Sequence, residues 1–328
     1  MKEALYYTKR EDGKLQCRLC PHTCTIADGR VGLCRVRRNR GGTLYSEIYG
    51  QVTSIAMDPI EKKPLYHFHP GASILSLGTR GCNFACEFCQ NWSISQAEAP
   101  TSPLTSKEAV RAAERDASIG IAYTYNEPFI WFEYVIETCR LVREAGLANV
   151  LVTNGYINPE PLDELLPYVD AINLDIKSIR PDFYRRLCRG TLEPVLATAK
   201  AAAPVTHLEI TNLIIPGEND SDDDLRDLAA WIATELGADT PVHLSAYFPR
   251  YKLKAPPTPA ATLERAHAIF SERLHYIYLG NCLSDKGANT VCRGCGAMLV
   301  ERHGYRVRMV GLDGTRCVAC GEESHIVV

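Results

Sequence analysis

The middle of the chain alternates apolar, strand-like runs with amphipathic, helix-like stretches. The apolar runs span residues 74–79, 121–126, 150–154, 171–177, 207–216, 241–248 and 276–280. Helical patterns are expected at residues 105–119, 129–145, 159–167, 192–203, 221–236 and 262–273. This alternation predicts a parallel sheet wrapped by helices. Periodicity alone leaves open a partial barrel of six βα units and a last strand, a full eight-stranded barrel, and an open doubly wound sheet.

One short loop carries three cysteines, Cys82, Cys86 and Cys89, in the run GTRGCNFACEFCQNW. The spacing Cys-x3-Cys-x2-Cys provides three thiolate ligands for a metal centre and no fourth. Electron-carrying cubane clusters have a thiolate on each of four irons, so three cysteines leave one iron open to a substrate or cofactor. Structural zinc prefers four closed ligands. The loop follows an apolar run, at a strand's carboxyl end, where α/β enzymes place their sites.

Polar residues follow three further predicted strands. Asn126 and Glu127 end the second strand, Asn154 ends the third, and Asp175 and Lys177 end the fourth. Strands buried on both faces should be apolar, so these groups need partners or a ligand. The plain alternative is that Asp175 and Lys177 only pair with each other. Because polar residues follow three consecutive strands, we favour the interpretation that they converge on the edge of the sheet that carries the cysteine loop.

The first 70 residues carry a second cysteine group, Cys17-x2-Cys20-x3-Cys24-x9-Cys34. Four thiolates with glycine and proline between them suffice for a closed tetrahedral site. A structural zinc is the first interpretation and an auxiliary iron–sulfur cluster is the second. His22 could replace one ligand, although a solvated loop histidine is favoured.

The C-terminal residues carry a third group, Cys292-x2-Cys295-x21-Cys317-x2-Cys320, with a β-like segment between its two pairs. This spacing predicts a zinc ribbon. A rubredoxin-like iron site has similar ligands, and zinc is favoured over it. So small a ribbon buries little core, so metal binding would supply much of its folding energy. It would serve either as a recognition module for a macromolecular substrate or as a stabilising appendage.

Composition narrows the class of protein. The 328 residues have a net charge of -3, with Lys+Arg 36 against Asp+Glu 39, which gives no electrostatic case for nucleic acid or an anionic membrane. A charged start and the lack of any apolar run near roughly 18 residues predict a cytoplasmic protein without a membrane span. Eleven of the 14 cysteines fall in the three groups, which is metal-site spacing in a reducing compartment. Cys139, Cys188 and Cys282 stand apart.

The cysteine loop, with Phe88 just before its third cysteine, resembles the radical S-adenosylmethionine (SAM) superfamily. The resemblance implies a partial (β/α)6 TIM-like barrel and a [4Fe–4S] cluster on the loop. It implies that the open iron is chelated by SAM, which is cleaved reductively to a 5′-deoxyadenosyl radical that abstracts hydrogen from the substrate. The electron would come from a flavodoxin or ferredoxin.

Segments of this chain that match segments of the superfamily imply which residues contact SAM. Phe88 would be one of these residues. Asn126 and Glu127 occupy the place of the superfamily's Gly-Gly-Glu segment, in which the acid hydrogen-bonds the methionyl amine. Asn154 and the Asp175-x-Lys177 segment resemble parts of pyruvate formate-lyase activating enzyme that meet the ribose and the methionine carboxylate. Lys177 would offer a cation to that carboxylate, and Asp175 or Asn154 would accept hydrogen bonds from the ribose.

The whole chain resembles the AmmeMemoRadiSam-system radical SAM proteins, relatives of the glycyl-radical-enzyme activases. The segments that carry the likeness are CRLCPHTC, DPIEKKPLYHFHPG, the cysteine loop, YTYNEP and the terminal ribbon. The resemblance implies Memo-like and AMMECR-like partners and a protein or peptide substrate. Three regions are expected: a cysteine-rich β extension at 1–70, the partial barrel at 71–285, and the ribbon at 286–328.

A different class of function also fits the cysteine groups. A non-catalytic iron–sulfur and zinc protein could carry electrons, or bind RNA or protein through its ribbon. The near-neutral charge and the open cysteine triad argue against it. The residues do not identify the substrate or the hydrogen donor.

Overall fold

The computed structural model describes residues 1–282 and 287–328. Its largest element is a sheet whose strands, in chain order, are β8 (Ser54–Pro59), β9 (Ser73–Gly78), β11 (Gly120–Tyr123), β12 (Ala148–Thr153), β13 (Ala171–Asp175), β14 (His207–Ile214), β15 (Val242–Ala246) and β16 (Ile277–Gly280). The hydrogen-bonded order is β16-β15-β14-β13-β12-β11-β9-β8. Neighbours from β9 to β16 run parallel, whereas β8 runs antiparallel to β9.

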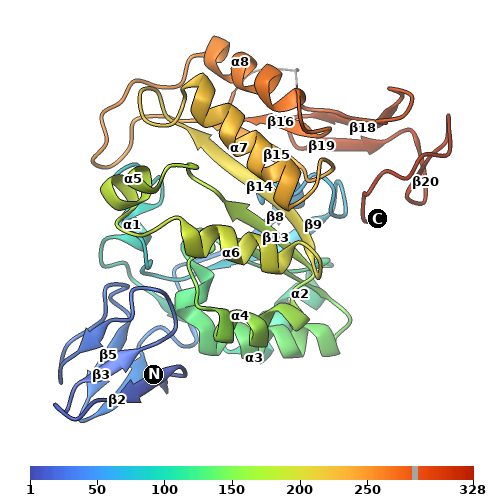
Figure 1. The fold of residues 1–328 in the computed structure, drawn as a ribbon. Coiled ribbons are helices and arrows are strands. Elements are labelled where there is room, and N and C mark those ends of the chain that lie inside the picture. Colours follow the sequence, from blue (N-terminus) through green and yellow to red (C-terminus); the bar gives the residue numbers. More distant parts are fainter. Residues whose placement is uncertain (283–286) are drawn as a thin grey trace.

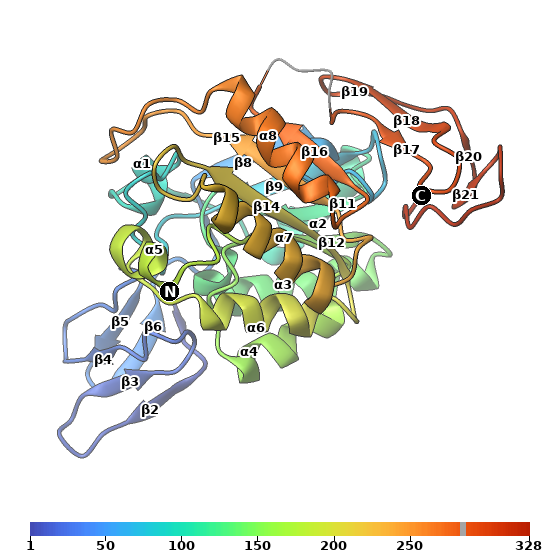
Figure 2. The same ribbon diagram turned by 45° about the horizontal axis from the view of Figure 1, so that its top comes forward.

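Helices follow the strands in turn. They are α2 (Ser106–Arg115), α3 (Phe132–Glu144), α4 (Pro159–Leu165), α6 (Glu193–Ala202), α7 (Asp222–Glu235) and α8 (Ala260–Ser271). Because neighbouring strands are sequential and such crossovers are right-handed, the helices fall on one face of the sheet. Figures 1 and 2 show α3, α4, α6, α7 and α8 in a row along that side. The predicted parallel α/β fold is confirmed.

The strand order argues against two of the three architectures that the sequence left open, the doubly wound sheet and the full eight-stranded barrel. A doubly wound sheet reverses its strand order, whereas this sheet is sequential from β9 to β16. In the described ranges the edge strands β16 and β8 each pair with one neighbour, so the hydrogen bonding does not close into a full barrel.

The predicted strands and helices are present, with ends that differ by a few residues. Strand β11 ends at Tyr123 and β12 at Thr153, so Asn126, Glu127 and Asn154 lie just beyond the strands. Strand β8 was not among the seven strands predicted for the sheet, because its residues fall in the β extension expected at 1–70. Its residues alternate in exposure along SIAMDP, as expected for an edge strand.

Shorter helical segments lie in the connections. They are α1 (Trp92–Ser95), α5 (Pro181–Phe183), η1 (Ile60–Lys62), η2 (Pro128–Trp131), η3 (Leu166–Tyr168) and the π-helical turn η4 (Tyr184–Cys188). None of the helices in the described ranges combines the length and the apolar character of a membrane span.

Local sequence explains where the longer helices begin. Thr105 caps α2 in a capping box, because its hydroxyl accepts from the Glu108 N–H while the Glu108 carboxylate accepts from the Thr105 N–H at 2.8 Å. Ser221 caps α7, whose first turn carries three aspartates at the positive end of the helix dipole.

The N-terminal residues form small antiparallel sheets. Their strands are β1 (Lys2–Glu3), β2 (Tyr7–Lys9), β3 (Leu15–Cys17), β4 (Thr25–Ile26), β5 (Arg37–Arg40) and β6 (Thr43–Ser46), in the orders β1-β6-β5 and β2-β3-β4. A further pair joins β7 (Gln51–Val52) to β10 (Ser102–Pro103). Leu15, Val36 and Leu44 belong to the same buried cluster as the residues of the main sheet. This segment therefore shares one hydrophobic core with the main sheet.

The C-terminal residues form a separate small unit beyond β16 (Figure 2). Its strands are β17 (Thr290–Val291), β18 (Met298–His303), β19 (Arg306–Met309), β20 (Leu312–Asp313) and β21 (Arg316–Cys317). Its core consists of Cys292, Leu299, Val300, Cys317 and Ile326. The expected boundary at 285/286 lies outside the described residues.

Candidate active site

The three central cysteines lie on the loop between β9 and α1, at the carboxyl end of the sheet (Figure 1). Cys86 is buried, and Cys82 and Cys89 are partly exposed. The Phe84 N–H donates to the Cys82 sulfur at 3.3 Å, and the Ser95 hydroxyl lies 3.1 Å from the Cys89 sulfur. Donors directed at sulfur stabilise a thiolate, so these residues fit the role of metal ligands.

The side chain of Asn126 holds the backbone that leads into this loop. Its Oδ1 accepts from the Thr79 N–H at 3.0 Å, and its Nδ2 donates to the Gly81 carbonyl at 3.0 Å. The amide therefore fixes the residues just before Cys82 to the end of β11. Asn126 has a positioning role toward the loop in this structure.

Glu127 joins the ends of β11 and β12. Its buried carboxylate accepts from the Thr153 hydroxyl at 2.7 Å, the Asn154 N–H at 2.8 Å and the Phe129 N–H at 3.0 Å. Burial raises the pKa of Glu127 to about 7, although these donors favour the ionised form. A carboxyl group that titrates near neutrality thus stands at the edge of the sheet that carries the cysteine loop.

Asn154 connects the end of β12 to the same loop. Its Nδ2 donates to Asn83 Oδ1 at 2.9 Å and lies 3.7 Å from the Cys82 sulfur. Asn83, buried between the first two cysteines, in turn donates to the Tyr156 carbonyl at 2.7 Å. Sequence reasoning missed Asn83, because a single asparagine inside a loop has no pattern that marks it.

Asp175 and Lys177 pair with each other, with 3.0 Å between Lys177 Nζ and Asp175 Oδ2. The pair also faces the loop, because the Lys177 ammonium lies 5.9 Å from the centroid of the Phe88 ring. Burial alone would lower the pKa of Lys177, but the charges of Asp175 and Cys86 raise it well above its ordinary value. Lys177 therefore keeps a positive charge beside the cysteines.

A fourth cysteine, Cys188, adjoins the loop. A hydrogen bond from Cys188 lowers the pKa of the Cys86 thiol. Backbone bonds hold the two segments together, since the Ala85 N–H donates to the Cys188 carbonyl at 2.9 Å and the Glu87 N–H donates to the Leu187 carbonyl at 3.0 Å. Cys188 was missed because it lies far along the chain from the triad and outside any spaced group.

The predicted polar residues are thus brought together. Asn126 contacts the backbone before Cys82, Asn154 contacts Cys82, and Lys177 lies near Cys86 and Phe88. The ends of three neighbouring strands therefore meet at the cysteine loop. Such a site can hold a thiolate-bound metal centre beside one cation and one titratable carboxyl group.

The C-terminal cysteines form a compact group. The sulfurs of Cys292, Cys295, Cys317 and Cys320 lie within 4.8 Å of one another, with 3.5 Å from Cys292 to Cys320 and 3.7 Å from Cys295 to Cys317. A tetrahedral metal with bonds of about 2.3 Å to sulfur spaces its ligands about 3.8 Å apart. The group therefore has the dimensions of a site for one metal ion.

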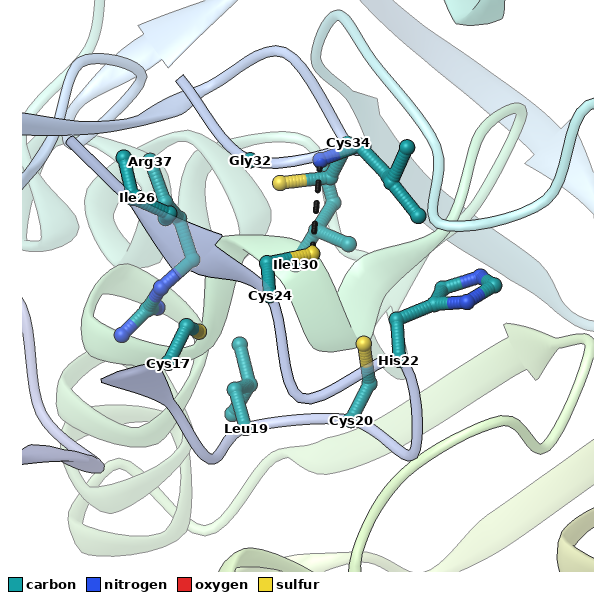
Figure 3. Close-up of a pocket in the computed structure, with 11 residues that line it drawn as sticks. Cys17, Leu19, Cys20, His22, Cys24, Ile26, Gly32, Cys34, Arg37 and Ile130 are labelled. Atoms are coloured by element: carbon teal, nitrogen blue, oxygen red, sulfur yellow. Dashed lines mark hydrogen bonds between the residues drawn. The ribbon is translucent and has the colours of Figure 1, made fainter. Parts of the chain in front are cut away.

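The N-terminal cysteines line one cavity with apolar side chains (Figure 3). Cys17 and Cys34 are buried, and Cys20 and Cys24 are partly exposed. His22, expected to be solvated, is half-buried and lies 2.8 Å, by its Nε2, from the Asn83 carbonyl. That contact ties the N-terminal segment to the central loop.

Comparisons with known proteins identify the class. The family model of the radical SAM superfamily matches residues 76–232. The chain is 46% identical over 336 residues to an uncharacterized protein of Methanocaldococcus jannaschii, with 100% of both chains covered. It is 28% identical over 167 residues to a pyruvate formate-lyase-activating enzyme of Listeria monocytogenes, covering 47% of this chain and 67% of that enzyme.

A solved structure has the same fold. The structure of a radical SAM methyltransferase from Sphaerobacter thermophilus matches with a TM-score of 0.51 and 18% identity, over 66% of this chain and 68% of that one. The chain belongs to the radical SAM superfamily and is an enzyme of the radical SAM type. Within the superfamily it is related to the pyruvate formate-lyase activating enzymes.

Proposed function

We propose that Cys82, Cys86 and Cys89 hold a [4Fe–4S] cluster whose open iron binds SAM. The observation that carries this proposal is the triad on one loop, with donors directed at Cys82 and Cys89 and the polar ends of three strands around it. With SAM bound, such a cluster supplies one electron to the sulfonium and releases a 5′-deoxyadenosyl radical that abstracts hydrogen from the substrate.

The surrounding residues would bind and orient SAM. Lys177 keeps its charge and would attract the methionine carboxylate, while Asp175 holds the ammonium in place. Glu127 would accept a hydrogen bond from the methionyl amine, and Asn154 would accept from the ribose. Phe88 would pack beside them, and Asn126 would keep the loop in register. The curvature of the sheet would be that of the partial barrel of the superfamily.

We propose a protein or peptide as the substrate, as in the activation of glycyl-radical enzymes. The support is the relationship to pyruvate formate-lyase activating enzymes and to a (2S)-3-sulfopropanediol dehydratase activating enzyme of Klebsiella oxytoca, at 25% identity over 119 residues. A flavodoxin or ferredoxin would deliver the electron. Memo-like and AMMECR-like proteins remain proposed partners by the AmmeMemoRadiSam resemblance.

The proposal also covers the C-terminal cysteine group and the division of the chain into regions. The compact C-terminal group would bind zinc as a ribbon, because its spacing suits one tetrahedral ion. The division into residues 1–70, 71–285 and 286–328 would then separate two cysteine-bearing extensions from the catalytic centre.

The test is SAM cleavage by the purified chain. The protein is reconstituted anaerobically with iron and sulfide and reduced with dithionite, and 5′-deoxyadenosine is measured by chromatography. Wild type and the matched control Cys139→Ala, which removes a buried thiol outside the three groups, should form the product. Cys82→Ala/Cys86→Ala/Cys89→Ala should form none. A wild-type protein with an intact reduced cluster that forms no more product than this variant would contradict the proposal.

A further inference from the structure

Four thiols of the N-terminal segment face one cavity. Cys17 ends β3, and the other three cysteines lie in the loops around β4 and before β5. Figure 3 shows the sulfurs directed into the same space. The remaining wall is mainly apolar, formed by side chains that include Leu19, Ile26 and Ile130. Thiols gathered in an apolar cavity suit a buried metal centre more than a solvent-exposed ion.

The spacing of these thiols differs from that of the C-terminal group. In the described part of the chain, no three of the N-terminal sulfurs lie within 4.8 Å of one another, whereas all four C-terminal sulfurs do. The sulfurs of Cys82, Cys86 and Cys89 in the central loop also do not all lie within 4.8 Å of one another. A single ion needs sulfurs about 3.8 Å apart. A four-iron cluster takes one thiolate on each iron, so its ligands lie farther apart.

The N-terminal group also adjoins the central loop. A Cβ atom on Gly81 would lie 2.7 Å from the Cys34 carbonyl oxygen, so the two backbones are in direct contact. Arg35 donates to the Ser95 carbonyl at 2.7 Å, and His22 bonds the Asn83 carbonyl. Centres held by the two groups would be separated by little more than these loops.

We propose that Cys17, Cys20, Cys24 and Cys34 hold a second [4Fe–4S] cluster that relays one electron to the central cluster. A flavodoxin or ferredoxin loses one electron, the N-terminal cluster gains it, and the same electron then reduces the central cluster. No bond in the protein forms or breaks, and the electron is consumed in SAM cleavage. The relay rests on the proposed function, whereas the presence of the second cluster does not.

Metal content tests the second cluster without any SAM chemistry. Reconstituted wild type should hold about eight irons per chain, and Cys82→Ala/Cys86→Ala/Cys89→Ala should keep about four, with matching sulfide. The cluster left in that variant should show an EPR signal that does not respond to SAM. Zinc instead of iron at the N-terminal cysteines, or no retained iron, would overturn the proposal.

The relay has its own test. Cys17→Ala/Cys34→Ala, or the less buried Cys20→Ser/Cys24→Ser if the first pair fails to fold, should still cleave SAM with dithionite but lose cleavage driven by reduced flavodoxin. Equal flavodoxin-driven cleavage in variant and wild type would overturn the relay. Failure of the proposed function looks different, because then the wild type cleaves no SAM with either reductant.

Discussion

The two outer cysteine groups have the same number of thiols and different surroundings. The N-terminal thiols are spread around a cavity and their segment shares its core with the main sheet. The C-terminal thiols are compact, and their unit has a small core of its own. A unit with so little core depends on its metal for folding, whereas a segment inside the main core can use its thiols for chemistry.

Each segment is anchored by one buried arginine, and the two anchors also differ. Arg37, at 1% exposure, pairs with Glu133 at 2.8 Å. Arg302, at 2% exposure, donates to the Tyr66 carbonyl at 2.6 Å and the Thr290 hydroxyl at 2.8 Å. It also lies over the Tyr66 ring, 4.3 Å from its centroid. One segment is held by an ion pair, the other by neutral acceptors and aromatic rings.

The largest effect should follow loss of the C-terminal metal. Cys292→Ser/Cys317→Ser removes two of four ligands, and structural zinc contributes roughly 10–16 kcal/mol to the folding of small domains. Residues 287–328 should become sensitive to protease while the main sheet stays intact. Limited proteolysis with mass spectrometry shows which region is cleaved, and the zinc content shows whether the metal has been lost. A metal-free unit that resists protease as well as the wild type would show that the core alone suffices.

Arg37→Met should be the next most damaging change. It leaves the Glu133 carboxylate buried without its cation, which costs about 3–5 kcal/mol. The matched control is Arg38→Met on the same strand, because Arg38 is 33% exposed and its pair with Glu47 contributes about 1 kcal/mol or less. Urea unfolding of the three proteins gives the comparison. Equal losses for both variants would contradict an ion-pair anchor.

Arg302→Met should cost less than Arg37→Met. The direct hydrogen-bond partners of Arg302 are neutral. The nearby buried Glu61, whose pKa is raised by burial and lowered by the charge of Arg302, keeps its hydrogen bond from the Gly71 N–H, so the expected loss is about 1–3 kcal/mol. The measurement is urea unfolding followed by protease sensitivity of residues 287–328. Arg308→Met serves as the control, since Arg308 is 76% exposed and pairs with Glu301. A loss as large as that of Arg37→Met would remove the distinction between the anchors.

The smallest effect concerns the contact between the N-terminal segment and the central loop. His22→Ala removes the bond to the Asn83 carbonyl and should lower stability by about 1 kcal/mol. It should also alter the EPR signal of the central cluster, because Asn83 contacts Cys82 and Asn154. His303→Ala, at an exposed position of the C-terminal unit, should leave that signal unchanged. An identical signal in His22→Ala and the wild type would argue that the loop is fixed by its other contacts.

Sequence patterns predicted those parts of the fold that depend on local order. Parallel strands buried on both faces appear in the sequence as apolar runs, which is why β9 and β11 to β16 could be predicted. Strand β8 lies in the β extension expected at 1–70 and was not assigned to the main sheet, because Ile55 and Met57 are exposed and its residues show no continuous apolar run. The convergence of Asn126, Asn154 and Lys177 was predictable because the carboxyl ends of parallel strands share one edge.

Contacts between distant segments could not be predicted in the same way. The hydrogen bond from Cys188 to Cys86 depends on how η4 packs against the loop, and His22 meets Asn83 through tertiary packing alone. Cysteine spacing predicted both outer groups as metal sites. It did not distinguish the compact group from the open one, because sulfur positions depend on how the loops fold around them.

The EPR spectrum of the reduced, reconstituted protein before and after addition of SAM shows whether the central loop carries an open iron. We expect SAM to shift the signal in wild type and in Cys17→Ala/Cys34→Ala. Cys82→Ala/Cys86→Ala/Cys89→Ala should show no signal that depends on SAM. A reduced wild-type spectrum that SAM leaves unchanged would contradict an open iron on the central loop.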